Sequence, residues 1–313
     1  MKYIYGPVPS RRLGLSLGVD LVPKKVCSYN CIYCQIGRTT LHTIERKEYL
    51  PADSILADVR EALEEWAGEI DYVTISGSGE PTLNERLGEI IKGIKGMTEI
   101  PLAVITNGSL LFMEEVREEL KEADLVLPSL DAVTPAVFET INRPHPALSL
   151  ERIIQGIKDF RREFRGEVWL EVLFCRGIND QPEEIRKLKE VISEINPQRV
   201  HLNTVTRPGA EDYAFALSAE KLRKIQQEWG KGVEVVTDFK GCSRRTIIDR
   251  LEEKILKLVA IRPVTLEDLS RTLGVRELEL VKTIEKLLQE KRLTFRVFNQ
   301  RIYYEAAQAL ENS

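Results

Sequence analysis

The sequence contains few of the residues that build disulfide frameworks and metal sites, with five cysteines and three histidines in 313 residues. Five cysteines, three of them in one loop, do not indicate a disulfide scaffold. No run of about 18 or more apolar residues is present, so we expect no membrane span. The segment after Met1 lacks the apolar centre of a secretory signal. Together these absences predict a cytoplasmic protein in a reducing environment.

The sequence also lacks a strong charge of either sign. Its formal net charge is −4, which excludes a polycation built to coat nucleic acid. Hydrophobic residues make up 43% and charged residues 30%, as in a globular protein with a real core. The length suits one large domain with a smaller one, or two of medium size.

Three cysteines occupy one short loop, with Cys27, Cys31 and Cys34 in a C-x3-C-x2-C pattern. Thiolates this close together can converge on one metal centre. Structural zinc takes four protein ligands, and most protein-bound iron–sulfur cubanes take four thiolates. The nearest candidates for a fourth ligand are His42 and Cys175. Without a fourth ligand, three thiolates would hold three irons of a cubane and leave the last iron open. A zinc site or a redox switch is the alternative.

The cysteine pattern, with the aromatic residue Tyr33 before the last cysteine, resembles the signature of the radical S-adenosylmethionine (radical SAM) superfamily. The flanking residues 6–14 (Gly-Pro-Val-Pro-Ser-Arg-Arg-Leu-Gly) and 35–39 (Gln-Ile-Gly-Arg-Thr) resemble the UPF0026 type, a branch near the NifB-related radical SAM proteins. The resemblance covers about the first three quarters of the chain. It implies that Cys27, Cys31 and Cys34 bind a [4Fe-4S] cluster, and that SAM chelates the open iron. Reductive cleavage of SAM would then give a 5′-deoxyadenosyl radical.

Short apolar runs alternate with amphipathic stretches, which predicts repeated β-α units and a parallel sheet. The fold class is therefore α/β, and a partial (β/α)6 barrel is the fold that the resemblance also implies. The predicted strands are 15–21, 71–76, 102–106, 124–130, 167–175, 199–205 and 232–236. The predicted helices are 54–66, 83–94, 113–122, 150–164 and 182–195.

The pattern changes after about residue 240. Helices are predicted over 247–261, 265–274 and 276–291, followed by a hairpin of 292–298 and 301–304. Three helices and a hairpin resemble a winged helix-turn-helix domain. We therefore expect a radical SAM partial barrel over residues 1–240 and a winged-helix-like domain over 241–313.

Polar residues follow several predicted strands, and ligands of parallel sheets lie beyond the carboxyl ends of the strands. The segment 77–80 resembles the glycine-rich segment of the superfamily, where glycines let the backbone approach SAM and a carboxylate accepts from its ammonium group. Each of these residues could instead be an ordinary turn, capping or packing residue. The residues expected to contact SAM are Tyr33, Gly77, Gly79, Glu80, Asn107, Ser129 and Asp131.

Two further cysteines lie outside the loop. Cys175 is expected to be a buried strand residue. Cys242 lies among cations that would lower its pKa, so it could donate hydrogen to a radical or bind substrate, or it could be inert.

The sequence therefore predicts a radical SAM enzyme, an oxidoreductase or transferase, whose catalytic residues and substrate the sequence does not identify. The substrate could be a small molecule, a peptide or RNA, and the electron donor a ferredoxin or flavodoxin. From residue 240 on, 15 Lys and Arg face 11 Asp and Glu, a mild nucleic-acid signal. The helix predicted over 276–291 nevertheless carries four glutamates, which phosphates repel. The alternative function is an iron–sulfur-sensing winged-helix regulator that binds DNA without turnover.

Overall fold

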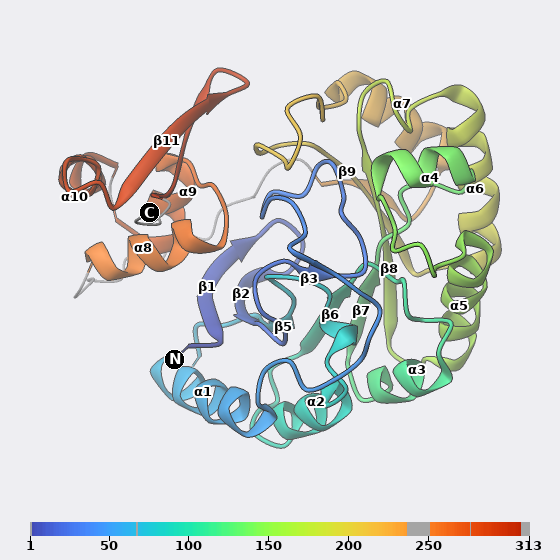
Figure 1. Cartoon of the computed structure of the whole chain (residues 1–313), viewed down its shortest axis with the longest axis horizontal. Helices are drawn as coiled ribbons and strands as arrows, with labels where there is room; N and C mark the ends of the chain where they lie inside the picture. The colour runs from blue at the N-terminus through green and yellow to red at the C-terminus, as the bar shows by residue number, and fades with distance from the viewer. Residues whose placement is uncertain (1, 67, 237–250, 276, 308–313) are drawn as a thin grey trace.

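The computed structural model of the chain describes residues 2–66, 68–236, 251–275 and 277–307. At its centre is the predicted partial barrel, a curved eight-stranded sheet (Figure 1) with the order β1-β2-β5-β6-β7-β8-β9-β10. The strands are β1 (Ile4–Ser10), β2 (Gly14–Val19), β5 (Tyr72–Ile75), β6 (Leu102–Thr106), β7 (Leu125–Pro128), β8 (Glu167–Phe174), β9 (Arg199–Thr204) and β10 (Val233–Val235).

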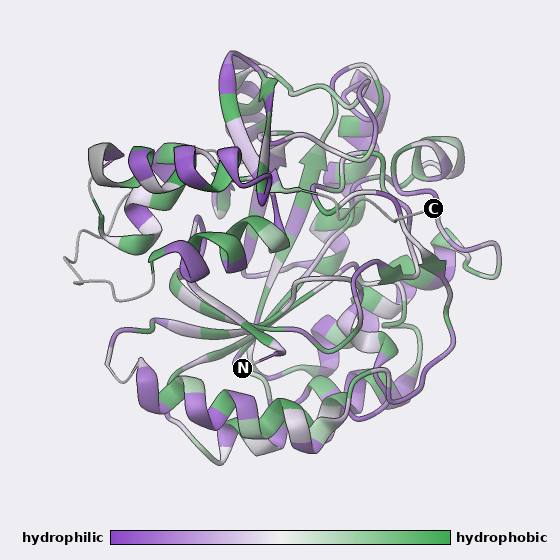
Figure 2. Ribbon diagram, turned by 60° about the vertical axis from the view of Figure 1, so that its left-hand side comes forward, coloured by the Kyte–Doolittle hydropathy of each residue, from purple (hydrophilic) through white to green (hydrophobic). Residues whose placement is uncertain are grey.

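Neighbouring strands from β2 to β10 are parallel, and only β1 is antiparallel to its neighbour in this sheet. Helices cover the outer face, and Figure 2 shows hydrophobic and hydrophilic residues alternating along them, as expected for helices with one buried face. These helices are α1 (Ala52–Glu65), α2 (Leu87–Lys95), α3 (Glu114–Leu120), α4 (Pro135–Ile141), α5 (Leu150–Glu163), α6 (Pro182–Ile195) and α7 (Ala219–Trp229). None of the described helices is long and apolar enough to cross a lipid bilayer.

The main core lies between the helices and the sheet, where Ile55 and Val59 of α1 pack with Val73 and Ile75 of β5. The inner face of the sheet has two parts. Toward the amino ends of the strands, a small apolar cluster that includes Leu127 fills the interior. Toward the carboxyl ends the inner face carries polar side chains, among them Thr74, Ser76 and Glu171. This division leaves room for a cavity at the edge where the parallel strands end.

The C-terminal part of the described chain is a separate unit beside β1 (Figure 1), with a core of its own. Its helices α8 and α9 contact β1. The element order is the predicted one of three helices and a hairpin, but the winged-helix assignment and the domain boundary at residue 240 stay predictions. Residues 237–250, with Cys242 and the start of the helix predicted at 247, lie outside the described residues. The elements are α8 (Leu251–Ile261), α9 (Leu266–Leu273), α10 (Glu277–Gln289), β11 (Leu293–Phe298) and β12 (Arg301–Ala306).

Candidate cofactor site at the cysteine loop

The cysteine loop leaves β2 and lies against the turn that follows β5. Lys25 N donates to Ser78 O at 2.6 Å, and Glu80 N donates to Val26 O at 3.0 Å. A Cβ on Gly79 would lie 2.0 Å from Val26 O, so only glycine allows this approach. Glycine is therefore needed here for contact between two protein segments. Whether Gly79 also contacts SAM stays a prediction.

Gly77 is constrained in a similar way. Its φ is +108°, and a Cβ would lie 2.1 Å from Oδ1 of Asp20. The same carboxylate accepts hydrogen bonds from the backbone N and the hydroxyl of Ser78, at 2.6 and 3.0 Å. The glycine-rich turn is thus fixed by the end of β2 as well as by the cysteine loop. The SAM contact predicted for Gly77 also stays a prediction.

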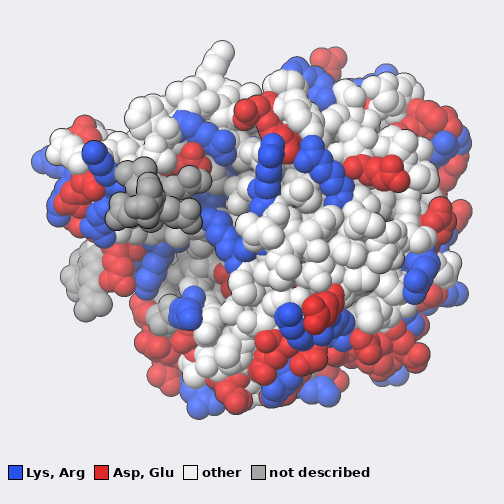
Figure 3. Space-filling model, viewed as in Figure 1, with Lys and Arg blue, Asp and Glu red and all other residues white. Residues whose placement is uncertain are grey.

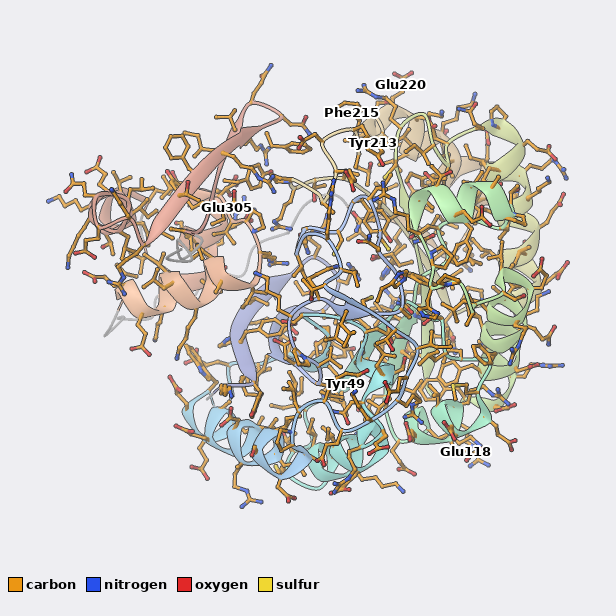
Figure 4. The ribbon with its side chains drawn as sticks, viewed as in Figure 1. Tyr49, Glu118, Tyr213, Phe215, Glu220 and Glu305 are labelled. Atoms are coloured by element: carbon orange, nitrogen blue, oxygen red, sulfur yellow. The ribbon has the colours of Figure 1, made fainter. Side chains whose placement is uncertain are left out.

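Two other segments hold the opposite side of the cysteine loop. Ile32 N donates to Ile141 O at 3.0 Å, and Glu211 N donates to Ile32 O at 2.9 Å. Glu211 accepts from Arg143 at 2.6 Å, and Arg143 also donates to the hydroxyl of Tyr213, labelled in Figure 4. The end of α4 and the segment that follows β9 therefore both bind the backbone of the cysteine loop.

Each cysteine sulfur of the loop faces at least one N–H donor. Donors of this kind stabilise thiolates and help to set the reduction potential of iron–sulfur clusters. The donors are Asn107 Nδ2 and Tyr29 N to Cys27 Sγ at 3.6 and 3.5 Å, Asn142 Nδ2 to Cys31 Sγ at 3.5 Å, and Lys25 Nζ to Cys34 Sγ at 3.1 Å.

Lys25 is unusual because its side chain is almost completely buried, with 4% exposed. Burial by itself would lower the pKa of this ammonium, but the three loop sulfurs in their thiolate form together outweigh it, so the pKa is raised. A buried ammonium is costly unless an anion compensates it. Thiolates that carry a cluster would supply this compensation. Sequence reasoning missed Lys25, because nothing in the sequence distinguishes it from Lys24.

The metal-binding side chains of the loop fit an iron–sulfur cluster better than a single metal ion. No three His, Cys, Asp or Glu side chains within the described ranges are placed to hold one metal ion together. Three thiolates that each bind a different iron do not need to meet at one point. His42 lies with Nε2 3.0 Å from Ser28 O, and Cys175 is fully buried, as expected. Neither is placed as a fourth ligand of a single-ion site.

The thiols of Cys27 and Cys31 are protonated when no metal is bound, because burial raises the pKa of both. Burial raises the pKa of Cys27 to about 12, with a further contribution from Glu80. Burial also raises the pKa of Cys31, next to Cys27 and Asp131. Iron must therefore displace protons when it binds, as is general for thiolate ligands.

Glu80 uses its carboxylate within the protein. It is 2% exposed, and burial raises its pKa. Its oxygens accept hydrogen bonds from the N and hydroxyl of Thr82, from the hydroxyl of Thr106 and from the N of Asn107, at 3.1, 2.6, 2.6 and 2.7 Å. A carboxylate has about four acceptor sites. Glu80 therefore positions Asn107, whose side-chain amide faces Cys27. The contact predicted between Glu80 and the SAM ammonium stays a prediction.

Asp131 plays a similar part at the end of β7. It accepts from the hydroxyl of Tyr33, from Asn142 Nδ2 at 2.7 Å and from Leu173 N at 2.8 Å. Burial raises its pKa to about 6. The predicted SAM contacts Tyr33 and Asp131 thus bind each other, and both lie beside Cys31. Their contact with SAM is likewise still a prediction.

Two polar groups at this edge of the sheet are free to form a further hydrogen bond, as far as the described residues show. Asn142 Oδ1 is buried and has no hydrogen-bond partner among the described residues. Ser129 is half-buried at the end of β7, where its backbone N donates to Thr106 O at 3.1 Å, and its hydroxyl has no partner among the described residues. An unpartnered buried oxygen beside a cysteine ligand is expected where a ligand donates to it. Sequence reasoning predicted Ser129 and missed Asn142.

Comparison with known proteins identifies relatives of the chain. The model of the Radical SAM superfamily matches residues 21–189. A UPF0026 protein of Methanocaldococcus jannaschii is 35% identical over 310 residues, which are 97% of this chain and 96% of the relative. A Brachyspira hyodysenteriae protein named GTPase Obg is 36% identical over 97% of this chain, which spans only 45% of that relative. The crystal structure of a radical SAM methyltransferase from Sphaerobacter thermophilus matches with a TM-score of 0.50 and 18% identity, over 70% of this chain and 65% of the other.

Proposed function

The chain belongs to the radical SAM superfamily and to the UPF0026 proteins, as the cysteine spacing and its flanks predicted, and we propose that it is a SAM-cleaving enzyme. Cys27, Cys31 and Cys34 hold a [4Fe-4S] cluster in this proposal, and SAM binds the open iron. When bound, a reduced cluster of this kind supplies the electron that cleaves SAM to methionine and a 5′-deoxyadenosyl radical. The substrate is not identified by membership of the family.

The observation that carries this proposal is the set of N–H donors around the three sulfurs. Asn107, Asn142 and Lys25 come from three separate segments, and each faces a different cysteine. A structural cysteine needs no such donor, whereas thiolates of a cluster accept these bonds. The buried charge of Lys25 supports the same conclusion, because neutral thiols could not compensate it.

The residues predicted to contact SAM divide into two groups in this proposal. Glu80 and Asp131 are positioning residues, because their oxygens bind the residues that orient the sulfurs. Ser129 and Asn142 are better placed to contact SAM directly, because the Ser129 hydroxyl and the Asn142 Oδ1 lack partners in the described part of the chain. Ser129→Ala and Asn142→Ala should therefore weaken SAM binding more than they reduce iron content.

The proposal is tested by anaerobic reconstitution with iron and sulfide, followed by reduction with dithionite and measurement of 5′-deoxyadenosine. Wild type should hold about four iron atoms per chain and form 5′-deoxyadenosine. Cys31→Ala should lose both properties. Cys175→Ala is the matched control, because this cysteine is buried and no loop cysteine is among the charges that act on it, and it should behave as wild type.

Two outcomes would count against the enzyme. Equal cleavage by wild type and Cys31→Ala would remove the ligand role of Cys31. A stable cluster without any SAM cleavage would favour the alternative, a regulator that senses iron–sulfur clusters and binds DNA without turnover. Salt-dependent binding to random DNA would then be expected.

A further inference from the structure

A cavity of about 280 Å³ opens at the carboxyl end of the sheet, beside the cysteine loop. Its wall includes Thr74 and Ser76 at the end of β5, and Gln35 and Ile36, which directly follow Cys34. The opposite wall comes from α8 and α9 of the C-terminal unit. The cavity therefore lies between the two units and next to the proposed cofactor site, which is where a substrate would have to bind.

The wall of this cavity is strongly basic. Four arginines line it, Arg11, Arg12, Arg207 and Arg262, against two carboxylates, Glu171 and Asp268. Figure 3 shows basic side chains gathered along the boundary between the C-terminal unit and the barrel. Since the net charge of the whole chain is −4, this local excess of cations is opposite to the charge of the molecule.

Only two of the four arginines have a carboxylate partner among the described residues. Arg12 pairs with Glu171 at 2.8 Å, and Arg207 pairs with Asp268 at 3.2 Å. Arg207 nevertheless keeps its buried Nε without an acceptor in the described structure. Hydrogen-bond donors on this wall therefore lack an acceptor within the described residues.

The other two arginines form no direct ion pair with a carboxylate within the described residues. Arg11 donates to neutral oxygens, to Asn203 Oδ1 at 3.1 Å and to Val236 O at 3.2 Å. No hydrogen bond or ion pair of Arg262 is recorded within the described residues. Two guanidinium groups on one cavity wall thus have no carboxylate in direct contact within the described chain, although the charge of Asp268 acts on both from a distance.

The pKa values of these two arginines also indicate that an anion would stabilise the cavity wall. Burial, with the neighbouring arginines, lowers the pKa of Arg11 to about 10, and burial and Arg207 lower that of Arg262 to about 9. Both side chains remain charged at neutral pH. Enclosed like charges repel one another, and an anion between them would remove this cost. Arginine suits this role because its planar fork matches the oxygens of phosphate and carboxylate groups.

We propose that the cavity binds the oxyanion group, phosphate or carboxylate, of a small-molecule substrate. The volume is close to the lower end for small-molecule sites and does not accommodate a folded macromolecule. The C-terminal unit then completes the substrate site, because it supplies Arg262 and Asp268. Only the identification of the bound anion as the substrate rests on the proposed function.

The anion site is tested on the metal-free full-length chain by titration calorimetry. Pyrophosphate probes for a phosphate group and citrate for a carboxylate group. Wild type should bind at least one of them, and Arg262→Gln should weaken the affinity about 10- to 100-fold, as expected for a lost hydrogen bond to a charged group. Arg186→Gln, which removes the same charge from the exposed face of α6, should bind as wild type does.

Several outcomes distinguish the possibilities. Tighter binding of pyrophosphate than citrate would assign a phosphate group, and the reverse order a carboxylate group. Arg262→Lys keeps the charge and should retain more affinity than Arg262→Gln, which separates lost charge from misfolding. The proposal is overturned if wild type binds neither probe, or if Arg262→Gln and Arg186→Gln have equal affinities.

The same measurement in the reconstituted protein separates this site from the SAM site. SAM should leave pyrophosphate binding unchanged, and displacement of the probe by SAM would contradict a separate substrate site. Because the calorimetry does not need the cluster, its failure is distinguishable from failure of SAM cleavage. A chain that binds the anion but cleaves no SAM would refute the proposed function alone.

Discussion

Lys24 and Lys25 are neighbours in the sequence, yet only Lys25 is buried. Its backbone N is held by Ser78 O, and its φ of +63° turns the chain at this point. The side chain therefore ends at Cys34 rather than in solvent. An ammonium in this position both compensates the charge of the thiolates and donates to one of them.

Replacing Lys25 by methionine should impair the cluster. Loss of a positive charge and a hydrogen-bond donor makes the reduction potential more negative, and loss of a residue that supports a metal ligand costs about 10- to 100-fold in affinity. We expect Lys25→Met to hold less iron and to have a lower midpoint potential in a spectroscopic redox titration. Lys24→Met is the matched control. Equal potentials in the two variants would show that Lys25 does not act on the cluster.

At the scale of single residues, the sequence predicts the three cysteine ligands better than it predicts the side chains around their sulfurs. Three cysteines in eight residues are conspicuous because their spacing is itself the signal. Lys25 and Asn142 are not conspicuous in the sequence. They reach the sulfurs only after the loop has folded against the turn after β5 and the end of α4. Glu80 and Asp131 were found at strand ends. Their partners could not be predicted, since hydrogen bonds between distant segments leave no local pattern.

The turn after β5 is the element on which the site depends most. It pairs with residues 25 and 26, and Gly79 allows the two backbones to approach each other closely. The following residues, Pro81–Leu83, form a short 3-10 helix capped by Glu80. The turn thus connects the sheet to the cysteine loop through its backbone.

A methyl group at Gly79 should separate these two elements. Gly79→Ala would place its Cβ 2.0 Å from Val26 O, so the backbone must shift. We expect a loss of about 1–3 kcal/mol in the free energy of unfolding, typical of overpacking, together with reduced iron content. Gly96→Ala is the control, because its Cβ would meet only atoms at 3.5 Å, and it should be neutral or slightly stabilising. Denaturant unfolding of the metal-free protein measures both, and equal stabilities would refute the close contact.

The parallel strands were predictable because each is a short apolar run that ends in polar residues. The edge strand β1 was missed, since Ile4–Ser10 contains a glycine and two prolines. Proline is tolerated in an edge strand, where one side of the ladder has no partner. Helix α7 was also missed, although Ser218 caps it by accepting from Lys221 N and Leu222 and Ile225 are buried. Its sequence does carry apolar residues at helical spacing, Leu222, Ile225 and Trp229, so the prediction overlooked a signal that was present.

Within the described residues, the barrel and the C-terminal unit each have a hydrophobic core of their own. The contact between them is partly polar. The hydroxyl of Tyr303 on β12 donates to Thr206 O after β9 at 2.7 Å, next to the ion pair of Arg207 with Asp268. This contact closes one side of the cavity proposed to bind the substrate.

Tyr303→Phe should weaken the attachment of the C-terminal unit. The substitution removes one hydrogen bond and leaves Thr206 O without its donor, which costs about 1 kcal/mol. Tyr304→Phe is the matched control, because no hydrogen bond of its hydroxyl is recorded in the described structure. Hydrogen exchange should become faster in β12 and α9 of Tyr303→Phe only. Identical exchange in the two variants would show that the hydroxyl does not hold the units together.

The central claim concerns the open corner of a cluster held by Cys27, Cys31 and Cys34. Its most direct test is the electron paramagnetic resonance spectrum of the reduced, reconstituted protein before and after addition of SAM. We expect the spectrum of a [4Fe-4S] cluster that shifts when SAM binds the open iron. A spectrum that SAM leaves unchanged, or a protein that holds only a four-coordinate zinc ion, would contradict this claim.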